Sequence, residues 1–368
     1  MAEENGKEIH KLFRLMRKYN ASDLHIKVGT PPVFRIAGTL RQLELPPLSD
    51  AQVRRLLYDI LTDEQIATFE QVGDVDFSHA VDDQTRLRIN AYHQRGHISL
   101  AARMVNCVVP TFDDLHLPPE VMERISSYEQ GLVIIGGVTG SGKSTTLAAI
   151  IEYINATRRC HVVTVEDPIE YIYTDKRALI NQREVGIDVP SFHDALRYVV
   201  RQDPDVILLG EMRDTETVQA GLSAAETGHL VFGTLHSATV AQTFSRLLEF
   251  FDAERQHQVR ASLQFNLRAV ICQKLLSSIK SGVARVPALE ILLVTAPVQK
   301  LIEAAEDARI LDLVRASRED GMIDFTRSLY ELIKDGYVDE ETAISAAPNP
   351  QALMANLEGV FAGTGTLR

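Results

Sequence analysis

The fold of this chain is decided by residues 132–151, LVIIGGVTGSGKSTTLAAII. An apolar run, typical of a buried strand, leads into a glycine-rich turn, and a helix-prone run follows it. In the centre, Gly137-x4-Gly142-Lys143-Ser144 fits the phosphate-binding loop pattern, because its glycines let backbone N–H groups turn inward around phosphate oxygens. A strand, a loop and a helix in this order predict a nucleotide site at a helix N-terminus.

The loop supplies residues for both phosphate and metal. Lys143 adds positive charge at the β- and γ-phosphates, and the Ser144 hydroxyl is of the type that ligates Mg²⁺. We therefore predict ATP or ADP with Mg²⁺ as ligands. The predicted nucleotide-binding residues are Gly137, Thr139, Gly140, Ser141, Gly142, Lys143, Ser144 and Thr145.

Around the loop, strand-like apolar runs alternate with helical stretches, which predicts an α/β domain with a largely parallel sheet and helices on both faces. We expect a mostly helical region from about Val240 and a flexible tail at 359–368. The runs that carry this prediction are 131–135, 145–155, 161–165, 192–201, 206–209 and 230–235.

The first 109 residues have a different, α+β pattern. An amphipathic helix is expected over 9–19, most simply as a core-packing helix, and capping-box patterns at Ser49 and Thr62 predict two more helices. Short strands are expected over 23–28, 33–36, 86–91 and 98–104. The stretch 110–119 holds three prolines and reads as a linker or hinge.

Composition limits the classes of function. The chain has 368 residues and a net charge of −12, which argues against a bulk electrostatic grip on nucleic acid. Three scattered cysteines, with no CxxC pair, suit a reducing cytosol and not a tetracysteine zinc site. The longest apolar runs are too short to span a bilayer, so we expect a cytoplasmic protein without a transmembrane segment.

Acidic residues and histidines follow the predicted strands. Glu211 ends an apolar run at the strand end where ligands bind in open α/β sheets, although Gly210 stands where an Asp is more usual. A second cluster, 166–170, offers Glu166 or Glu170 to orient the attacking water, and composition does not choose between them. His229 and His236 bracket a predicted strand, where they could sense a γ-phosphate by hydrogen bonding.

Six motifs, taken together and in order, resemble the secretion ATPases that drive type IV pili and type II secretion. The best match is the pilus-retraction (PilT/PilU-like) branch. The motifs are ASDLHI (21–26), GSGKSTTLAA (140–149), VEDPIEY (165–171), NQREVG (181–186), DPDVILLGEMRD (203–214) and AAETGHLVFGTLH (224–236).

The resemblance implies an N-terminal PAS-like α+β domain (1–109), a hinge (110–119) and a RecA-like P-loop ATPase domain with a helical C-terminal part (120–358). It implies a homohexamer at the cytoplasmic side of the inner membrane, attached through a pilus platform protein and working beside a sister pilus ATPase. Nucleotide would bind between the two domains. The catalytic residues that it implies are Glu170 as general base, Glu211 as Walker B acid, His229, His236, and arginine fingers at Arg88 and Arg103, with Arg86 and Arg95 as alternatives.

Two features sort the branches of this family. The chain lacks the zinc insertion and the long N-terminal region of many assembly-type members, which favours retraction over extension. The stretch 297–304, PVQKLIEA, keeps the apolar pair of a motif usual in retraction members but differs at its charged positions. An accessory or regulatory nucleotide-binding subunit, or an extension or secretion ATPase, is therefore the alternative. A nucleic-acid translocase would share the core, but the negative charge disfavours it.

Overall fold

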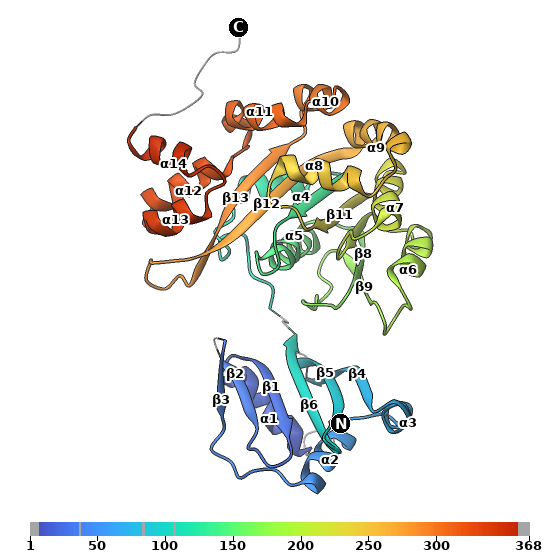
Figure 1. Cartoon of the computed structure of the whole chain (residues 1–368). Coiled ribbons are helices and arrows are strands. Elements are labelled where there is room, and N and C mark those ends of the chain that lie inside the picture. The colour runs from blue at the N-terminus through green and yellow to red at the C-terminus, as the bar shows by residue number, and fades with distance from the viewer. Residues whose placement is uncertain (1–6, 37, 83–84, 106–107, 360–368) are drawn as a thin grey trace. The chain divides into compact units, whose positions relative to one another are not determined.

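The computed structural model describes residues 7–36, 38–82, 85–105 and 108–359. These residues form two compact units, each built on its own sheet (Figure 1). The first unit takes the described residues up to Val108 together with Glu170–Ile172, and the second takes Val109–Ile169 and the described residues from Tyr173 onward. Apart from Gly359, the predicted tail lies outside the described residues.

The first unit is an antiparallel sheet of strand order β3-β2-β1-β6-β5-β4 with three helices. Alternate residues of β5 are buried, so one face of the sheet packs on the core. The elements are α1 (Glu8–Lys18), β1 (Ala21–Lys27), β2 (Val33–Ile36), β3 (Thr39–Gln42), α2 (Asp50–Tyr58), α3 (Asp63–Val72), β4 (Asp74–Asp82), β5 (Thr85–Gln94) and β6 (His97–Val105).

Local sequence signals in this unit are confirmed where they are strong. Helix α1 buries its apolar face, including Ile9 and Phe13, as a core-packing helix should. Ser49 and Thr62 cap α2 and α3 with complete capping boxes. Strands β3 and β4 were not predicted, because β3 is exposed along its whole length and β4 carries three aspartates.

The second unit is a seven-stranded sheet of order β13-β12-β7-β11-β10-β8-β9, parallel except for the β12–β13 pair. Every residue of β7, β10 and β11 is buried, so both faces of the central sheet are covered, as predicted. The strands are β7 (Gly131–Gly136), β8 (His161–Glu166), β9 (Leu179–Glu184), β10 (Val206–Leu209), β11 (Leu230–Leu235), β12 (Leu267–Ser277) and β13 (Arg285–Leu293).

Helices surround this sheet, and α5 begins at the phosphate-loop lysine (Figure 1). The helices are α4 (Pro119–Ser126), α5 (Lys143–Thr157), α6 (Phe192–Val199), α7 (Thr215–Glu226), α8 (Val240–Glu249), α9 (Ala253–Asn266), α10 (Ala296–Glu303), α11 (Ile310–Ala316), α12 (Phe325–Lys334), α13 (Glu340–Ala346) and α14 (Pro350–Leu357). None of the described helices is long and apolar enough to cross a bilayer.

Two features of the second unit were not apparent from the sequence. The region after Val240 is mostly helical, as expected, but the long strands β12 and β13 interrupt it, and β12 joins the central sheet beside β7. Residues 110–119, predicted as a linker or hinge, begin the second unit and pack partly on it. Phe112 and Leu117 are buried in the core of the second unit, and this apolar burial fixes the segment to that unit.

Candidate nucleotide site

The phosphate loop joins β7 to α5 through three glycines with positive φ. Gly137, Gly140 and Gly142 have φ of 155°, 80° and 92°, conformations that side chains disfavour. At Gly137 a Cβ atom would also stand 2.8 Å from the backbone oxygen of Gln273. Glycine is therefore favoured in the loop for two reasons: the turn needs positive φ angles, and at Gly137 the backbone of a neighbouring strand leaves no room for a Cβ atom.

Lys143 is folded over the loop that it belongs to. Its Nζ donates hydrogen bonds to the carbonyl oxygens of Gly137 (2.8 Å) and Val138 (3.2 Å). The ammonium group is therefore already held at the loop, where the positive end of α5 also lies. This is the arrangement expected of a phosphate site.

The predicted acid, Glu211, lies just beyond the carboxyl end of β10, two strands away from β7. One carboxylate oxygen is 3.0 Å from Nε2 of His236, and the other accepts a 2.8 Å bond from Arg213. His236 follows β11, which pairs with both β10 and β7. The structure therefore brings Glu211 and His236 together at the sheet edge that carries the loop.

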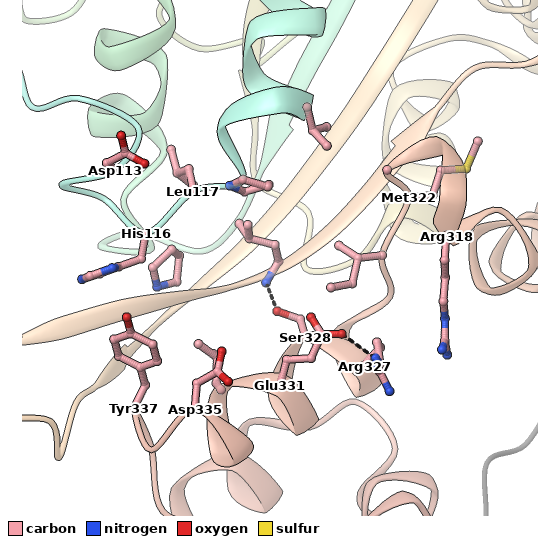
Figure 2. Close-up of a pocket in the computed structure, with 17 residues that line it drawn as sticks. Asp113, His116, Leu117, Arg318, Met322, Arg327, Ser328, Glu331, Asp335 and Tyr337 are labelled. Carbon is pink, nitrogen blue, oxygen red and sulfur yellow. Dashed lines mark hydrogen bonds and ion pairs between the residues drawn. The ribbon is translucent and has the colours of Figure 1, made fainter.

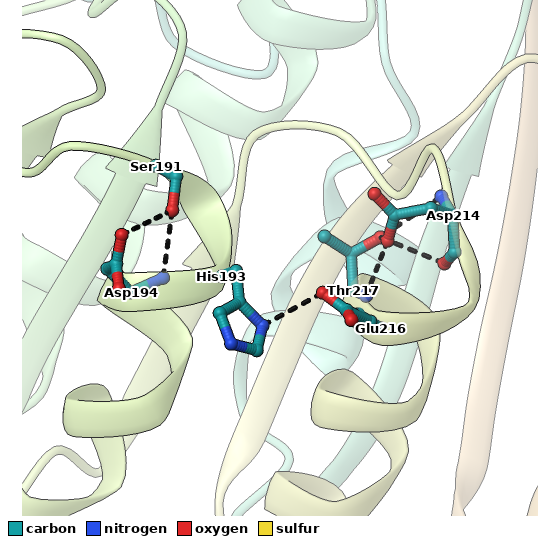
Figure 3. Close-up of polar contacts among 6 residues, drawn as sticks. All are labelled: Ser191, His193, Asp194, Asp214, Glu216 and Thr217. Carbon is teal, nitrogen blue, oxygen red and sulfur yellow. Dashed lines mark hydrogen bonds and ion pairs between the residues drawn. The ribbon is translucent and has the colours of Figure 1, made fainter.

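Arg213 extends this group and was not predicted. It reaches Asp167 at 3.9 Å as well as Glu211, and its hydrogen bond with Glu211 raises the pKa of the guanidinium. Asp214 then caps α7 by accepting a 2.8 Å bond from the N–H of Thr217 (Figure 3). Arg213 follows Glu211 by two residues and directly precedes the capping Asp214. That position is the sequence signal that could have identified it.

The helices beside this turn are also joined to each other. His193 on α6 contacts Glu216 on α7, with 2.8 Å between Nδ1 and Oε2 (Figure 3). Ser191 caps α6 in the same region. These contacts link α6 to the first turn of α7, which begins shortly after Glu211.

The glycine before Glu211 has a packing reason. A Cβ atom at Gly210 would lie 3.2 Å from both the Cα of Glu166 and the carbonyl oxygen of Val165. Strands β8 and β10 approach too closely here for a larger residue without a shift of the backbone. The sheet geometry thus accounts for Gly210 where an Asp is more usual.

The two candidate bases differ in their surroundings. Glu166, at the end of β8, accepts a 2.6 Å bond from the Thr164 hydroxyl and a 3.4 Å bond from Gln182. Glu170 lies four residues further on, in the loop after β8, and is exposed. Glu170 is therefore the more accessible of the two to water, and it is also the base that the resemblance implies.

The structure does not bring His229 to this group. His229 precedes β11 and its Nδ1 is 2.9 Å from the carbonyl oxygen of Ala224, whereas His236 follows the same strand. Six strand residues separate the two by about 20 Å. Within one chain the two histidines cannot sense the same phosphate, so the joint role first considered for them needs correction.

In the first unit, Arg88 and Arg103 face each other across β5 and β6. Arg103 donates to Asp23 at 2.8 Å. Burial raises the pKa of Asp23, but hydrogen bonds from Arg103 and Ser22 outweigh it, so this pKa lies below its usual value. Of the two alternatives, Arg86 is exposed near the start of β5, and Arg95 is exposed in the turn after it.

A cavity of about 650 Å³ lies elsewhere in the second unit (Figure 2). The segment 110–119 forms one wall through Asp113, His116 and Leu117, and α12 forms another. Within it Arg327 is hydrogen-bonded to Glu331 at 2.5 Å. The sequence indicated no such cavity, because its walls are far apart along the chain.

Comparison with known proteins places the chain. The family model described as type II/IV secretion system protein matches residues 5–336. The chain belongs to this family. This confirms the resemblance carried by the six motifs, and membership together with the intact phosphate loop identifies the chain as an ATPase.

Individual members of the family are similar over nearly the whole chain. The type IV pilus retraction ATPase PilT of Pseudomonas aeruginosa is 42% identical over 94% of this chain and 99% of its own. The type IV pilus ATPase PilU of the same organism is 36% identical over 94% and 90%. A crystal structure of the pilus retraction motor PilT with bound ADP matches 94% of this chain and 98% of its own, with a TM-score of 0.87 at 40% identity.

Proposed function

We propose that this chain is a motor ATPase that powers type IV pilus retraction. The observation that carries the proposal is the Glu211–His236 pair at the same sheet edge as the phosphate loop, in a chain 42% identical to PilT. A phosphate loop alone is shared by many proteins. The acid–histidine pair beside it, in this family, favours hydrolysis over simple binding.

In the proposed reaction, the loop N–H groups and Lys143 hold the β- and γ-phosphates. Glu170 orients and deprotonates the attacking water. His236 and Arg213 fix both oxygens of Glu211, which keeps its carboxylate aimed. Ser144 and Glu211 offer the hydroxyl and carboxylate oxygens that Mg²⁺ prefers, and the ion would supply positive charge that neutralises the phosphates.

Arg88 and Arg103 are proposed as phosphate partners from the first unit. They lie opposite each other on adjacent strands, so they can present two guanidinium groups side by side. Arg103 is already paired with Asp23 and keeps 75% of its side chain exposed, which leaves it able to meet a phosphate. Contacts made only on domain closure would couple hydrolysis to movement.

We further propose that the motor is a homohexamer in the cytoplasm, attached peripherally to the inner membrane through a pilus platform protein and working beside a sister pilus ATPase. PilU, which is 36% identical to this chain, supports the existence of sister enzymes. Mixing wild-type chain with a Lys143→Ala variant tests the ring directly. In a cooperative ring, activity falls more steeply than the fraction of wild-type subunits; independent subunits give a linear fall.

The enzymatic part of the proposal is tested with purified protein. We expect ATP hydrolysis that requires Mg²⁺ and disappears in Lys143→Ala. No Mg²⁺-dependent hydrolysis, even in assembled protein with its platform partner, would refute the motor function. Turnover stimulated by DNA or RNA would instead favour a translocase.

A second candidate function is an accessory nucleotide-binding subunit with little hydrolysis. The altered stretch 297–304 favours it. This stretch lies on α10, where Val298 and Ile302 are buried, while Lys300 and Glu303 are exposed. The charged positions at which this stretch differs from the retraction motif therefore lie on the exposed face of α10. If this function is correct, Glu170→Ala leaves pilus phenotypes nearly intact; complete loss of retraction would count against it.

A further inference from the structure

A glutamine on a neighbouring strand contacts the phosphate loop at two points. Gln273 lies in β12, which runs parallel to β7 and pairs Cys272 with Gly136. Its side chain is buried, with 2% of the residue exposed. The amide Nε2 donates to the carbonyl oxygen of Ser141 at 2.6 Å, and Oε1 accepts from the Thr146 hydroxyl at 2.9 Å.

The two partners belong to different parts of the loop structure. Ser141 is in the loop, and Thr146 is in the first turn of α5. One side chain therefore ties the loop to the helix that follows it. Its orientation is fixed, because a carbonyl oxygen only accepts hydrogen bonds and must face the amide N–H.

The backbone fit around Gln273 is equally close. A Cβ atom would stand 2.8 Å from the Gln273 carbonyl oxygen at Gly137, and 2.9 Å from its Nε2 at Gly142. Real Cβ contacts do not come this near without movement. The backbone and side chain of Gln273 thus lie close to two glycines of the loop, Gly137 and Gly142.

Gln273 is a buried polar residue in a largely apolar strand, β12. Residues 269–272 and 275–276 of the same strand are apolar, and a buried amide is unfavourable unless both its donor and its acceptor are bonded. Gln273 satisfies both within the loop and its helix. An apolar residue would suffice for the sheet alone, so the amide serves the loop.

We propose that Gln273 is a positioning residue that holds the phosphate loop in its binding conformation before nucleotide arrives. The inference rests on the proposed function, since it takes the loop to be the nucleotide site. A loop already ordered loses less conformational freedom when it binds phosphate, so Gln273 raises nucleotide affinity without touching nucleotide itself.

The first test compares ADP dissociation constants for wild type and Gln273→Met at neutral pH. Methionine has a similar length and fills the space, but it neither donates to Ser141 nor accepts from Thr146. We expect ADP to bind about tenfold more weakly. The midpoint of thermal unfolding without nucleotide should change little compared with the shift that ADP produces in wild type.

The second test uses Gln273→Glu, which has a signature that a general packing role would not produce. A protonated carboxyl has the shape and bonding capacity of the amide, whereas the ionised form cannot donate to Ser141 and adds negative charge beside the phosphates. The ratio of mutant to wild-type dissociation constant should therefore rise as pH increases from about 5.5 to about 8.5. Low pH should restore near-normal binding.

Gln219→Glu is the matched control. Gln219 is half-buried on α7 and accepts a hydrogen bond from Arg255, so it carries the same charge change outside the loop. Its ADP affinity should equal that of wild type at every pH. Unchanged ADP affinity in Gln273→Met, or a pH-independent ratio for Gln273→Glu, would overturn the inference. Failure of wild type to bind ADP would instead contradict the proposed function.

Discussion

At the residue scale, two carboxylates in this region are held by neighbouring side chains and a third is exposed. Glu211 is held by His236 from the end of β11 and by Arg213 from its own turn. Glu166 is held by Thr164 and Gln182, while Glu170 is left exposed. Held carboxylates keep one geometry, and the exposed one is accessible to water. This difference separates Glu211 and Glu166 from Glu170, the proposed base.

The proposed base is tested by two matched variants. We expect Glu170→Gln to lower kcat by roughly 10²–10⁴-fold, because the amide cannot take a proton from water, with ADP affinity unchanged. Glu166→Gln should have a much smaller effect on kcat, since the Glu166 carboxylate is already hydrogen-bonded to the Thr164 hydroxyl at the end of β8. Steady-state turnover and ADP titration of both variants provide the measurement. The reverse order of effects would assign the base to Glu166.

The two histidines should separate in the same assays. His236→Ala removes a direct partner of Glu211, so we expect kcat to fall by about tenfold or more. His229→Ala acts at the other end of β11 and should leave ADP binding by the isolated chain unchanged. If His229→Ala weakened ADP binding by the monomer, the placement of His229 away from the loop would be wrong.

At the element scale, sequence patterns predicted the elements whose signals are local. Capping boxes identified α2 and α3, and apolar runs identified β7, β10 and β11. Strand β12 was missed, because its place in the sheet depends on pairing with β7, more than a hundred residues earlier. Gln273 was missed with it. A buried polar residue inside an apolar run is a signal only once the strand is known.

A pH prediction belongs to the packing of α1 on the first sheet. His10 on α1 and His79 on β4 lie with their Nε2 atoms 2.8 Å apart, and burial, with a smaller effect from His10, lowers the pKa of His79 to about 4. The unfolded chain, with an ordinary histidine pKa near 6.5, binds this proton more readily. Stability is therefore complete above about pH 6.5 and is lost as pH falls towards about 4.

Hydrogen-exchange protection of the α1 amides, measured at several pH values, checks this prediction. Protection should fall between about pH 6.5 and about pH 4 in wild type. His79→Gln keeps a hydrogen-bonding side chain but cannot titrate, so its protection should change less over the same range. Equal pH dependence in the two proteins would show that other groups control the stability of this unit.

At the scale of the whole molecule, the six ordered motifs carried most of the correct interpretation. They predicted the family, the two-sheet α/β architecture and the phosphate site, and the family match over residues 5–336 agrees with them. The burial of Phe112 and Leu117 moves the segment 110–119 into the second unit, which composition could not show, because prolines favour linkers and surface turns alike.

The central claim, that hydrolysis by this chain powers retraction, is tested most directly by counting surface pili on native cells in which the chain is deleted. Loss of the chain should leave pili assembled but unable to withdraw. We therefore predict more surface pili and no twitching, with both defects corrected by the wild-type chain and not by Glu170→Gln. Cells without pili would contradict retraction and identify the chain as an extension motor.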